Sequence, residues 1–150
     1  METTKIAQIA TLPERLKSLR LSLNSIYDQV DKIYVSLNGH QVCPDYDDID
    51  NKIIWYKLDN SRSDGAKFYN AELRNGYVIT LDDDLAVPDG FVDLLISKVN
   101  QYKGACSLHG KIYPRPPIDF RKAKIIYRCL GTVSTDNKID LIGTGCMAYH

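Results

Sequence analysis

Short apolar and β-branched runs recur along the chain, separated by polar or amphipathic stretches. Runs of this composition, bounded by turn residues, are typical of β-strands. They predict five strands, over Lys5–Ala10, Lys32–Leu37, Ile53–Leu58, Tyr77–Leu81 and Gly104–Leu108. The fourth run is rich enough in β-branched and aromatic residues to be a central strand.

Two of the intervening stretches have the apolar spacing of an amphipathic helix. The first follows Thr11, which has the pattern of a capping box with Glu14, and continues to about Asp28. The second begins at Pro88 and places four apolar side chains on one face, at Val92, Leu95, Ile96 and Val99. A weaker helical pattern covers Ala66–Arg74. Strands that alternate with helices predict an α/β fold with a mostly parallel sheet flanked by helices.

Polar and proline-rich segments interrupt this pattern. The acidic stretch Gln41–Asn51 lacks the glycine and the final glutamate of a calcium-binding loop, so it predicts a solvated loop. Tyr113–Pro117 must be a loop, because proline cannot continue a helix or a central strand. Two shorter strands are predicted beyond it, over Lys122–Tyr127 and Ile139–Ile142. One domain over residues 1–150 accounts for the whole pattern.

The charge balance excludes one class of function. Nineteen lysines and arginines offset nineteen aspartates and glutamates, whereas proteins that neutralise nucleic-acid phosphates have a basic excess or a basic face. No apolar run approaches the roughly 18 residues of a membrane span. No apolar segment follows Met1 as it does in a secretory signal. We therefore expect a cytoplasmic protein with no nucleic-acid partner and no membrane span.

The cysteines are scattered, at Cys43, Cys106, Cys129 and Cys146. Zinc ligands are typically clustered in sequence, so this spacing predicts no zinc site. A disulfide framework is also not expected in a chain of this length without a secretory signal. We expect reduced, mostly buried thiols.

Three consecutive aspartates, Asp82, Asp83 and Asp84, follow directly on the fourth strand. Ligands of parallel sheets bind at the carboxyl ends of the strands. Extended backbone would place Asp82 and Asp84 on one side and Asp83 on the other. Two carboxylates about 4 Å apart repel by about 4 kcal/mol at an effective dielectric constant of about 20, and a divalent cation reverses that sign. Hard oxygen ligands suit Mg²⁺ or Mn²⁺. The alternative is an acidic turn that caps the helix at Pro88.

Two other classes of metal-dependent protein have a strand that ends in aspartate. ATPases also need a glycine-rich phosphate-binding motif that ends in lysine and serine or threonine, and the chain has none. Phosphatases of the haloacid dehalogenase type carry their aspartate pair after the first strand, whereas here the acidic residues follow the fourth. Both classes therefore fit the sequence less well.

The order of the segments resembles a known family. Thr11–Arg15 leads from the first strand into a helix, Ile33–Asn38 forms the second strand, and the three aspartates end a later hydrophobic strand. Asp64–Lys67 lies upstream of the aspartates and Gly143–Gly145 downstream. Over about Lys5–His150 these motifs are similar to the nucleotide-sugar-binding half of GT-A glycosyltransferases of the family 2 type. The resemblance implies the Rossmann-like GT-A fold.

The resemblance implies a role for each matching position. The metal ligands would be Asp82 and Asp84. The nucleotide-binding residues would be Thr11, Pro13, Arg15, Asn38, Asp59, Lys67, Asp82 and Asp83. Positive charge on Lys67 or Arg15 would stabilise a departing diphosphate. The alternative for Lys67 is a solvated surface lysine, and that for Arg15 is solvent contact or a pair with a nearby acid.

Histidines complete the candidate chemistry. His109 follows the fifth strand, on the side where the resemblance places the acceptor, and an imidazole can act as a catalytic base near neutral pH. The alternative for His109 is a buried, hydrogen-bonded side chain. His40 and His150 have no comparable context and are expected at the surface.

The expected function is metal-dependent glycosyl transfer. The donor is a nucleoside-diphosphate sugar, with a UDP-sugar expected, the acceptor is a saccharide, and the cofactor is Mn²⁺ or Mg²⁺. Gly143–His150 resembles the stretch before the family's catalytic acidic residue, so we expect the chain to lack the C-terminal acceptor and base region. Two alternatives stay open: a non-catalytic sugar-nucleotide-binding domain, and a Mg²⁺-dependent nucleotidyltransferase or phosphohydrolase. Thr11–Arg15 contains no glycine, which disfavours a nucleotidyltransferase.

Overall fold

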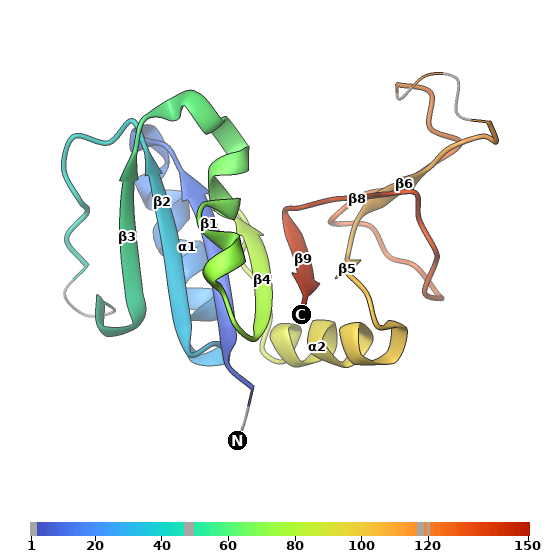
Figure 1. Ribbon diagram of the computed structural model, residues 1–150, viewed down its shortest axis with the longest axis horizontal. Helices are drawn as coiled ribbons and strands as arrows, with labels where there is room; N and C mark the ends of the chain where they lie inside the picture. The colour runs from blue at the N-terminus through green and yellow to red at the C-terminus, as the bar shows by residue number, and fades with distance from the viewer. Residues whose placement is uncertain (1–2, 47–49, 117–118, 120) are drawn as a thin grey trace.

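The computed structural model describes residues 3–46, 50–116, 119 and 121–150. Its largest element is a six-stranded sheet with the order β3-β2-β1-β4-β9-β5 (Figure 1). The first four strands of the chain form a parallel group: β1 (Lys5–Thr11), β2 (Lys32–Asn38), β3 (Ile53–Leu58) and β4 (Tyr77–Asp82). β9 (Cys146–Tyr149) pairs antiparallel with β4 on one side and with β5 (Cys106–Ser107) on the other.

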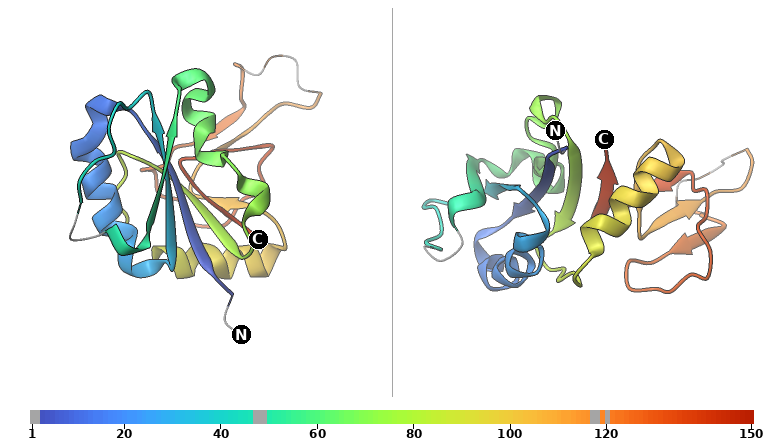
Figure 2. Two further views of the ribbon diagram at one scale, coloured as in Figure 1. Left: turned by 60° about the vertical axis from the view of Figure 1, so that its left-hand side comes forward. Right: turned by 90° about the horizontal axis from the view of Figure 1, so that it is seen from below.

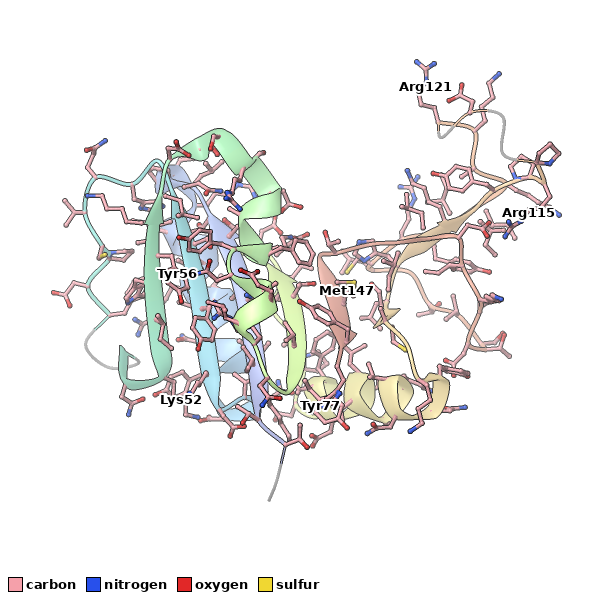
Figure 3. The ribbon with its side chains drawn as sticks, in the orientation of Figure 1. Lys52, Tyr56, Tyr77, Arg115, Arg121 and Met147 are labelled. Atoms are coloured by element: carbon pink, nitrogen blue, oxygen red, sulfur yellow. The ribbon has the colours of Figure 1, made fainter. Side chains whose placement is uncertain are left out.

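A second, antiparallel sheet lies in the C-terminal part of the chain, with the order β7-β6-β8. Its strands are β6 (Gly110–Ile112), β7 (Ile125–Tyr127) and β8 (Leu141–Ile142). Figure 3 shows the side chains of Arg115 and Arg121 at the outer end of this part, away from the six-stranded sheet. We call this sheet and its loops, residues 110–142, the C-terminal arm.

Helices cover the parallel strands on one face and a 3-10 segment covers the other. The helices are α1 (Leu16–Ile26) and α2 (Phe91–Tyr102). Shorter 3-10 segments are η1 (Pro13–Arg15), η2 (Tyr27–Gln29), η3 (Asp50–Lys52), η4 (Asn60–Phe68) and η5 (Ala71–Leu73). The strands lie between α1 and η4, which contacts β1 and β2 (Figures 1 and 2). Within the described residues, no helix combines the length and the apolar character that crossing a bilayer requires.

One hydrophobic core joins the helices to the sheet. Leu19, Leu23 and Ile26 of α1 belong to the same buried cluster as Val92 and Leu95 of α2 and the apolar side chains of β1, β2 and β4. Strands of a parallel sheet are covered on both faces and therefore have near-continuous apolar sequences. This is why the strongest apolar runs of the sequence became the central strands.

The predicted fold class is confirmed. The sheet is mostly parallel and flanked by helices, and β1, β2, β3 and β4 agree with the predicted strands to within one residue. The fourth strand lies inside the sheet, between β1 and β9, as its composition indicates. The predicted strands near the C-terminus are shortened to β5, β7 and β8, while β6 and β9 were not predicted.

The capping box predicted at Thr11 and Glu14 is wrong. Thr11 is the last residue of β1, opposite Leu37, and its buried hydroxyl donates to the carbonyl oxygen of Leu12 at 3.4 Å. The 3-10 turn η1 follows, and α1 begins only at Leu16. Pairing with β2 holds Thr11 in the sheet, so it cannot cap the helix.

Two other helix predictions need correction. Ala66–Arg74 forms 3-10 turns instead of an α-helix, because Asn70, with φ of 55°, interrupts any continuous helical backbone. α2 begins at Phe91 rather than at Pro88, with Gly90 as its N-cap. The predicted loop Gln41–Asn51 is confirmed for residues 41–46. Its residues 47–49, and Pro117 of the other predicted loop, lie outside the described residues.

Candidate functional site

The last residues of three neighbouring parallel strands face a common cavity. Thr11, Asn38 and Asp82 end β1, β2 and β4, and all three line a cavity of about 410 Å³. This is the edge of an α/β sheet where ligands bind. The other lining residues come from the end of β1 and the turn after it, from η4 and from the turn after β4: Ala10, Leu12, Arg15, Asn60, Ser63, Asp64, Asp83 and Asp84.

The three consecutive aspartates adopt a turn instead of continuing the strand. β4 ends at Asp82, and the backbone N–H of Leu85 donates to the carbonyl of Asp82 at 3.3 Å. The expectation that extended backbone separates Asp83 from its neighbours is therefore wrong, since all three residues line the cavity. Their exposure differs sharply, because the side chain of Asp83 is 4% exposed and that of Asp84 is 54% exposed.

Arg15 pairs with two of the aspartates. Its Nη1 donates to Asp83 Oδ1 at 2.9 Å and lies 3.6 Å from Asp84 Oδ2. The hydrogen bond to Asp83 and the charge of that carboxylate raise the pKa of Arg15. The structure shows Arg15 paired with a nearby acid, which was one of the alternatives left open by the sequence. The guanidinium is still about half exposed, so it has N–H groups left for an anion in the cavity.

Lys67 is a buried ion-paired lysine and not a solvated one. Its side chain is 1% exposed, and its Nζ contacts Asp64 Oδ1 at 2.8 Å and Asp82 Oδ1. A buried ammonium is tolerated only when it is paired, and both of its partners line the cavity. Arg15 and Lys67 therefore offset the repulsion among the aspartates. Within the described residues, the aspartate carboxylates do not gather around one point.

Two oxygen atoms of cavity-lining residues have no hydrogen-bond partner. Asp83 Oδ2 and Asn38 Oδ1 are both buried and unpaired. The amide nitrogen of Asn38 is engaged, because it donates to the carbonyl of Ser63 at 2.9 Å. Ser63 in turn holds a left-handed φ of 47°, a strained conformation for a residue with a side chain. Unsatisfied oxygens and a strained loop at one cavity are the features of a site that completes its bonds with a ligand.

Several residues around the cavity were not predicted. Asn60, Ser63 and Asp64 line it from η4, together with Leu12 from the turn after β1. Asp64 had a signal in the sequence, since it begins the segment Asp64–Lys67 that the family resemblance uses. Asn60 and Ser63 had only a polar composition, which any surface loop shares.

Other predicted site residues do not line the cavity. Pro13 begins the turn η1, and Asp59 caps η4 by accepting from the backbone N–H of Ser61 at 3.2 Å. Hydrogen bonds from Ser61 lower the pKa of Asp59. Lys67 does not line the cavity itself, although its ion-pair partners Asp64 and Asp82 do. His109 is also not among the lining residues. Nucleotide contacts by Pro13, Asp59 and Lys67 stay predictions.

His109 lies against two glycines and a cysteine. A Cβ at Gly143 would come within 1.9 Å of the imidazole, and one at Gly145 within 2.3 Å of Asp82 Oδ2 and 3.2 Å of His109 Cε1. Nδ1 of His109 is 3.4 Å from Cys146 Sγ. Burial lowers the pKa of His109, and the charge of Asp82 offsets this only in part. The imidazole is therefore neutral at neutral pH.

The expectations for the cysteines and for His40 need correction. All four cysteines are free thiols. The prediction that they are mostly buried is wrong, because only Cys146 is buried, whereas Cys43 is exposed and the other two are partly exposed. Burial, followed by the contact with Cys129, raises the pKa of Cys146 to about 12. The fold also brings Cys129, Cys146 and His109 together, which their sequence spacing did not indicate. His40, expected at the surface, is only 5% exposed.

The residues at the cavity have the donor atoms that a hard divalent cation prefers, but their carboxylates would have to turn toward it. Their donor atoms are carboxylate oxygens, the kind that Mg²⁺ and Mn²⁺ prefer, and Asp83 Oδ2 lacks a partner. The Asp84 side chain is more than half exposed and only loosely paired with Arg15, so it can turn toward a cation at small cost. Gly145 leaves room beside Asp82 Oδ2 that a side chain would fill.

Comparisons with known proteins place the fold in a broad class. No family model matches the chain, and no curated protein matches it. The structure is similar to the crystal structure of 2-C-methyl-D-erythritol 4-phosphate cytidylyltransferase from Francisella tularensis, with a TM-score of 0.56 and 14% sequence identity. The match covers 98% of this chain and 72% of that chain. At this identity the likeness shows the fold alone: a Rossmann-like α/β fold of the kind found in a nucleotidyltransferase.

Proposed function

We propose that the chain binds a nucleoside-diphosphate sugar together with Mn²⁺ or Mg²⁺ and transfers the sugar to a saccharide acceptor, with a UDP-sugar as the donor. One observation carries the proposal. Four aspartates and an exposed arginine line a cavity at the carboxyl ends of β1, β2 and β4, where two buried oxygens have no hydrogen-bond partner. The motifs that resemble family 2 glycosyltransferases supply the sugar-nucleotide part of the proposal.

Five residues that line the cavity have a role in the proposed reaction. Asp82 and Asp84 would hold the cation, which when bound supplies Lewis-acid stabilisation of the leaving diphosphate. Arg15, anchored by Asp83, keeps a positive charge in place where negative charge develops, so little reorganisation is needed during transfer. The unpaired Asn38 Oδ1 is an acceptor for a donor group of the nucleotide.

A base for the acceptor hydroxyl is the remaining requirement of an inverting transfer. His109 is the candidate from the sequence, and its imidazole is neutral because burial lowers its pKa. Since Nδ1 lies against Cys146, an acceptor would have to reach Nε2. This role for His109 stays a prediction.

Calorimetric titration of UDP, GDP, CDP and CTP, with and without Mn²⁺, tests donor binding. We expect UDP binding that depends on Mn²⁺ and is at least about tenfold weaker, or about 1.4 kcal/mol, in Asp84→Asn. The matched control is Asp89→Asn, an exposed aspartate outside the cavity. Equal UDP affinity in both variants contradicts the proposal, and UDP release from a UDP-sugar separates a transferase from a non-catalytic binding domain.

A second candidate function is metal-dependent nucleotidyl transfer. The fold likeness to a cytidylyltransferase favours it, while the absence of glycine from Thr11–Arg15 disfavours it. Tight CTP binding in the same titrations, together with pyrophosphate release once a phosphate-bearing acceptor for the CMP group is added, would replace glycosyl transfer with this function.

A further inference from the structure

We propose that His109, Cys129 and Cys146 bind a soft divalent cation, Zn²⁺, at a site separate from the aspartate cavity, and that this ion ties the C-terminal arm to the six-stranded sheet. The proposal rests on the geometry and chemistry of these three side chains. It does not depend on the proposed glycosyl transfer.

Three strand boundaries bring the ligands together. His109 lies between β5 and β6, Cys129 follows β7, and Cys146 is the first residue of β9. Cys129 and Cys146 are 17 positions apart, and His109 and Cys146 are 37 positions apart. Two of the ligands thus flank strands of the six-stranded sheet, and the third comes from the arm.

The donor atoms have nearly the spacing of a metal site. The two Sγ atoms are 3.1 Å apart, Nδ1 of His109 is 3.4 Å from Cys146 Sγ, and all three donor atoms lie within 4.8 Å of one another. Zn–S bonds of about 2.3 Å and Zn–N bonds of about 2.0 Å place the ligand atoms of a tetrahedral centre about 3.5–3.8 Å apart. Changes of about 1 Å in these separations would accommodate the ion.

The donor set selects the metal. Thiolates and imidazole favour Zn²⁺ over Mg²⁺ and Mn²⁺, which prefer the carboxylates of the neighbouring cavity. Binding releases one proton from each of the two thiols to solvent and leaves the imidazole neutral. Three protein ligands leave the fourth tetrahedral position to a water molecule.

The backbone around His109 is fixed by hydrogen bonds, and its ring lies against Gly143. The backbone N–H of Gly143 donates to the carbonyl of His109 at 2.9 Å, and the Ser107 hydroxyl donates to the carbonyl of Gly143 at 2.8 Å. Gly143 has no side chain to displace the ring, which a Cβ would approach to 1.9 Å.

A disulfide between Cys129 and Cys146 is the competing outcome. The two sulfur atoms are about 1 Å farther apart than in a disulfide bond, and both residues are free thiols. A disulfide would use neither His109 nor its orientation toward Cys146. Bound Zn²⁺ would protect the two thiols from oxidation, whereas disulfide formation would not depend on Zn²⁺, and an experiment can measure this difference.

The site changes the role of His109. An imidazole that ligates a metal through Nδ1 is not free to accept a proton as a general base. Zinc binding would thus leave His109 with a structural task and would place the base of the proposed transferase elsewhere. Titration of the metal alone decides between these roles.

The test uses the full chain, reduced with a phosphine and stripped with a chelator. Zn²⁺ is titrated in competition with a chromophoric chelator, and Co²⁺ is added in its place as an optical probe. We expect one tightly bound Zn²⁺ per chain and, with Co²⁺, a thiolate-to-metal charge-transfer absorption. Oxidised glutathione should then modify Cys129 and Cys146 more slowly in the zinc-loaded chain than in the stripped chain.

Variants separate this site from others. Cys129→Ser and His109→Gln, both at half-buried positions, should weaken Zn²⁺ binding by more than the roughly hundredfold that an outer-shell change can cost. Cys43→Ser, which removes an exposed cysteine outside the cluster, should leave it unchanged. Circular dichroism checks that each variant is folded. Equal zinc affinity in Cys129→Ser and Cys43→Ser, or a disulfide that forms equally fast with and without zinc, overturns the proposal.

Discussion

In the parallel part of the six-stranded sheet, Ile9 and Ile79 are completely buried, whereas in the C-terminal arm Ile125 and Ile126 are 39% and 54% exposed. The parallel strands have α1 on one face and η4 on the other, and α2 packs against β5 and β9. The arm has one small antiparallel sheet and few buried side chains, with Tyr113 the clearest. The same chain therefore stabilises its two ends by different means.

Polar contacts stabilise the C-terminal arm, whereas the burial of apolar side chains stabilises the parallel strands. Asp140 accepts from the backbone N–H of Tyr113 at 2.8 Å and pairs with Arg115, and Cys129 contacts Cys146 of β9. A region with few buried apolar contacts opens at a lower free energy than the core. Stability should therefore depend on the parallel strands, and the order of the arm on a few directional contacts.

The largest expected effect comes from a core truncation. Leu23→Ala, at a completely buried position on α1, should lower the free energy of unfolding by about 2–5 kcal/mol, because it leaves a cavity among packed side chains. Its counterpart in the arm, Ile126→Ala, should change it by less than about 0.5 kcal/mol. Chemical denaturation followed by circular dichroism measures both. Similar losses in the two variants would contradict the division between the regions.

An intermediate effect is expected from the buried lysine at the cavity. Lys67→Met keeps the apolar stem but leaves Asp82 and Asp64 without their cation, and it should lower the free energy of unfolding by about 1–3 kcal/mol. The loss stays below that of a fully buried pair, because both carboxylates are partly exposed. Lys17→Met, at an exposed position on α1, is the control for the same denaturation experiment.

The smallest expected effect is a pH dependence from His40. Burial lowers the pKa of His40, and the bond to the carbonyl of Leu12 offsets this only in part. The unfolded chain, with a histidine pKa of about 6.5, then binds the proton first as the pH falls. Stability should decrease as the pH drops below that value and level off below the pKa of the folded state.

Denaturation at several pH values measures this contribution of His40. His40→Leu should flatten the decrease between neutral and mildly acidic pH. His150→Leu, which changes an exposed histidine, should leave the decrease as it is in the unaltered chain. A slope that is the same in both variants would remove His40 as its source.

The parallel strands could be predicted from the sequence because each is a run of apolar residues whose burial depends little on its partners. β9 could not, because Cys146–Tyr149 is only four residues long and pairs with β4, which lies far earlier in the chain. The 3-10 turns of η4 and η5 could not be predicted for a related reason. Ser63 and Asn70 adopt left-handed backbone that no local pattern of apolar residues encodes.

The candidate cavity was predictable in its place but not in its contacts. Asp82, Asp83 and Asp84 follow a buried strand, so their position at the edge of the sheet was readable. Lys67 became their buried partner because η4 folds across β1 and β2. Arg15 reached Asp83 because β1 and β4 are neighbours, so the turns that follow them meet at one edge of the sheet. These pairings join residues that are far apart in the chain.

The amino-acid sequence by itself determined the α/β class, the central strands and the acidic residues at one sheet edge, because apolar periodicity and local backbone preference act over a few neighbouring residues. Only the tertiary structure decided which charges are neutralised, which oxygens are left unpaired and which sulfur atoms meet His109. Those outcomes depend on distances between segments that only the packed chain brings together.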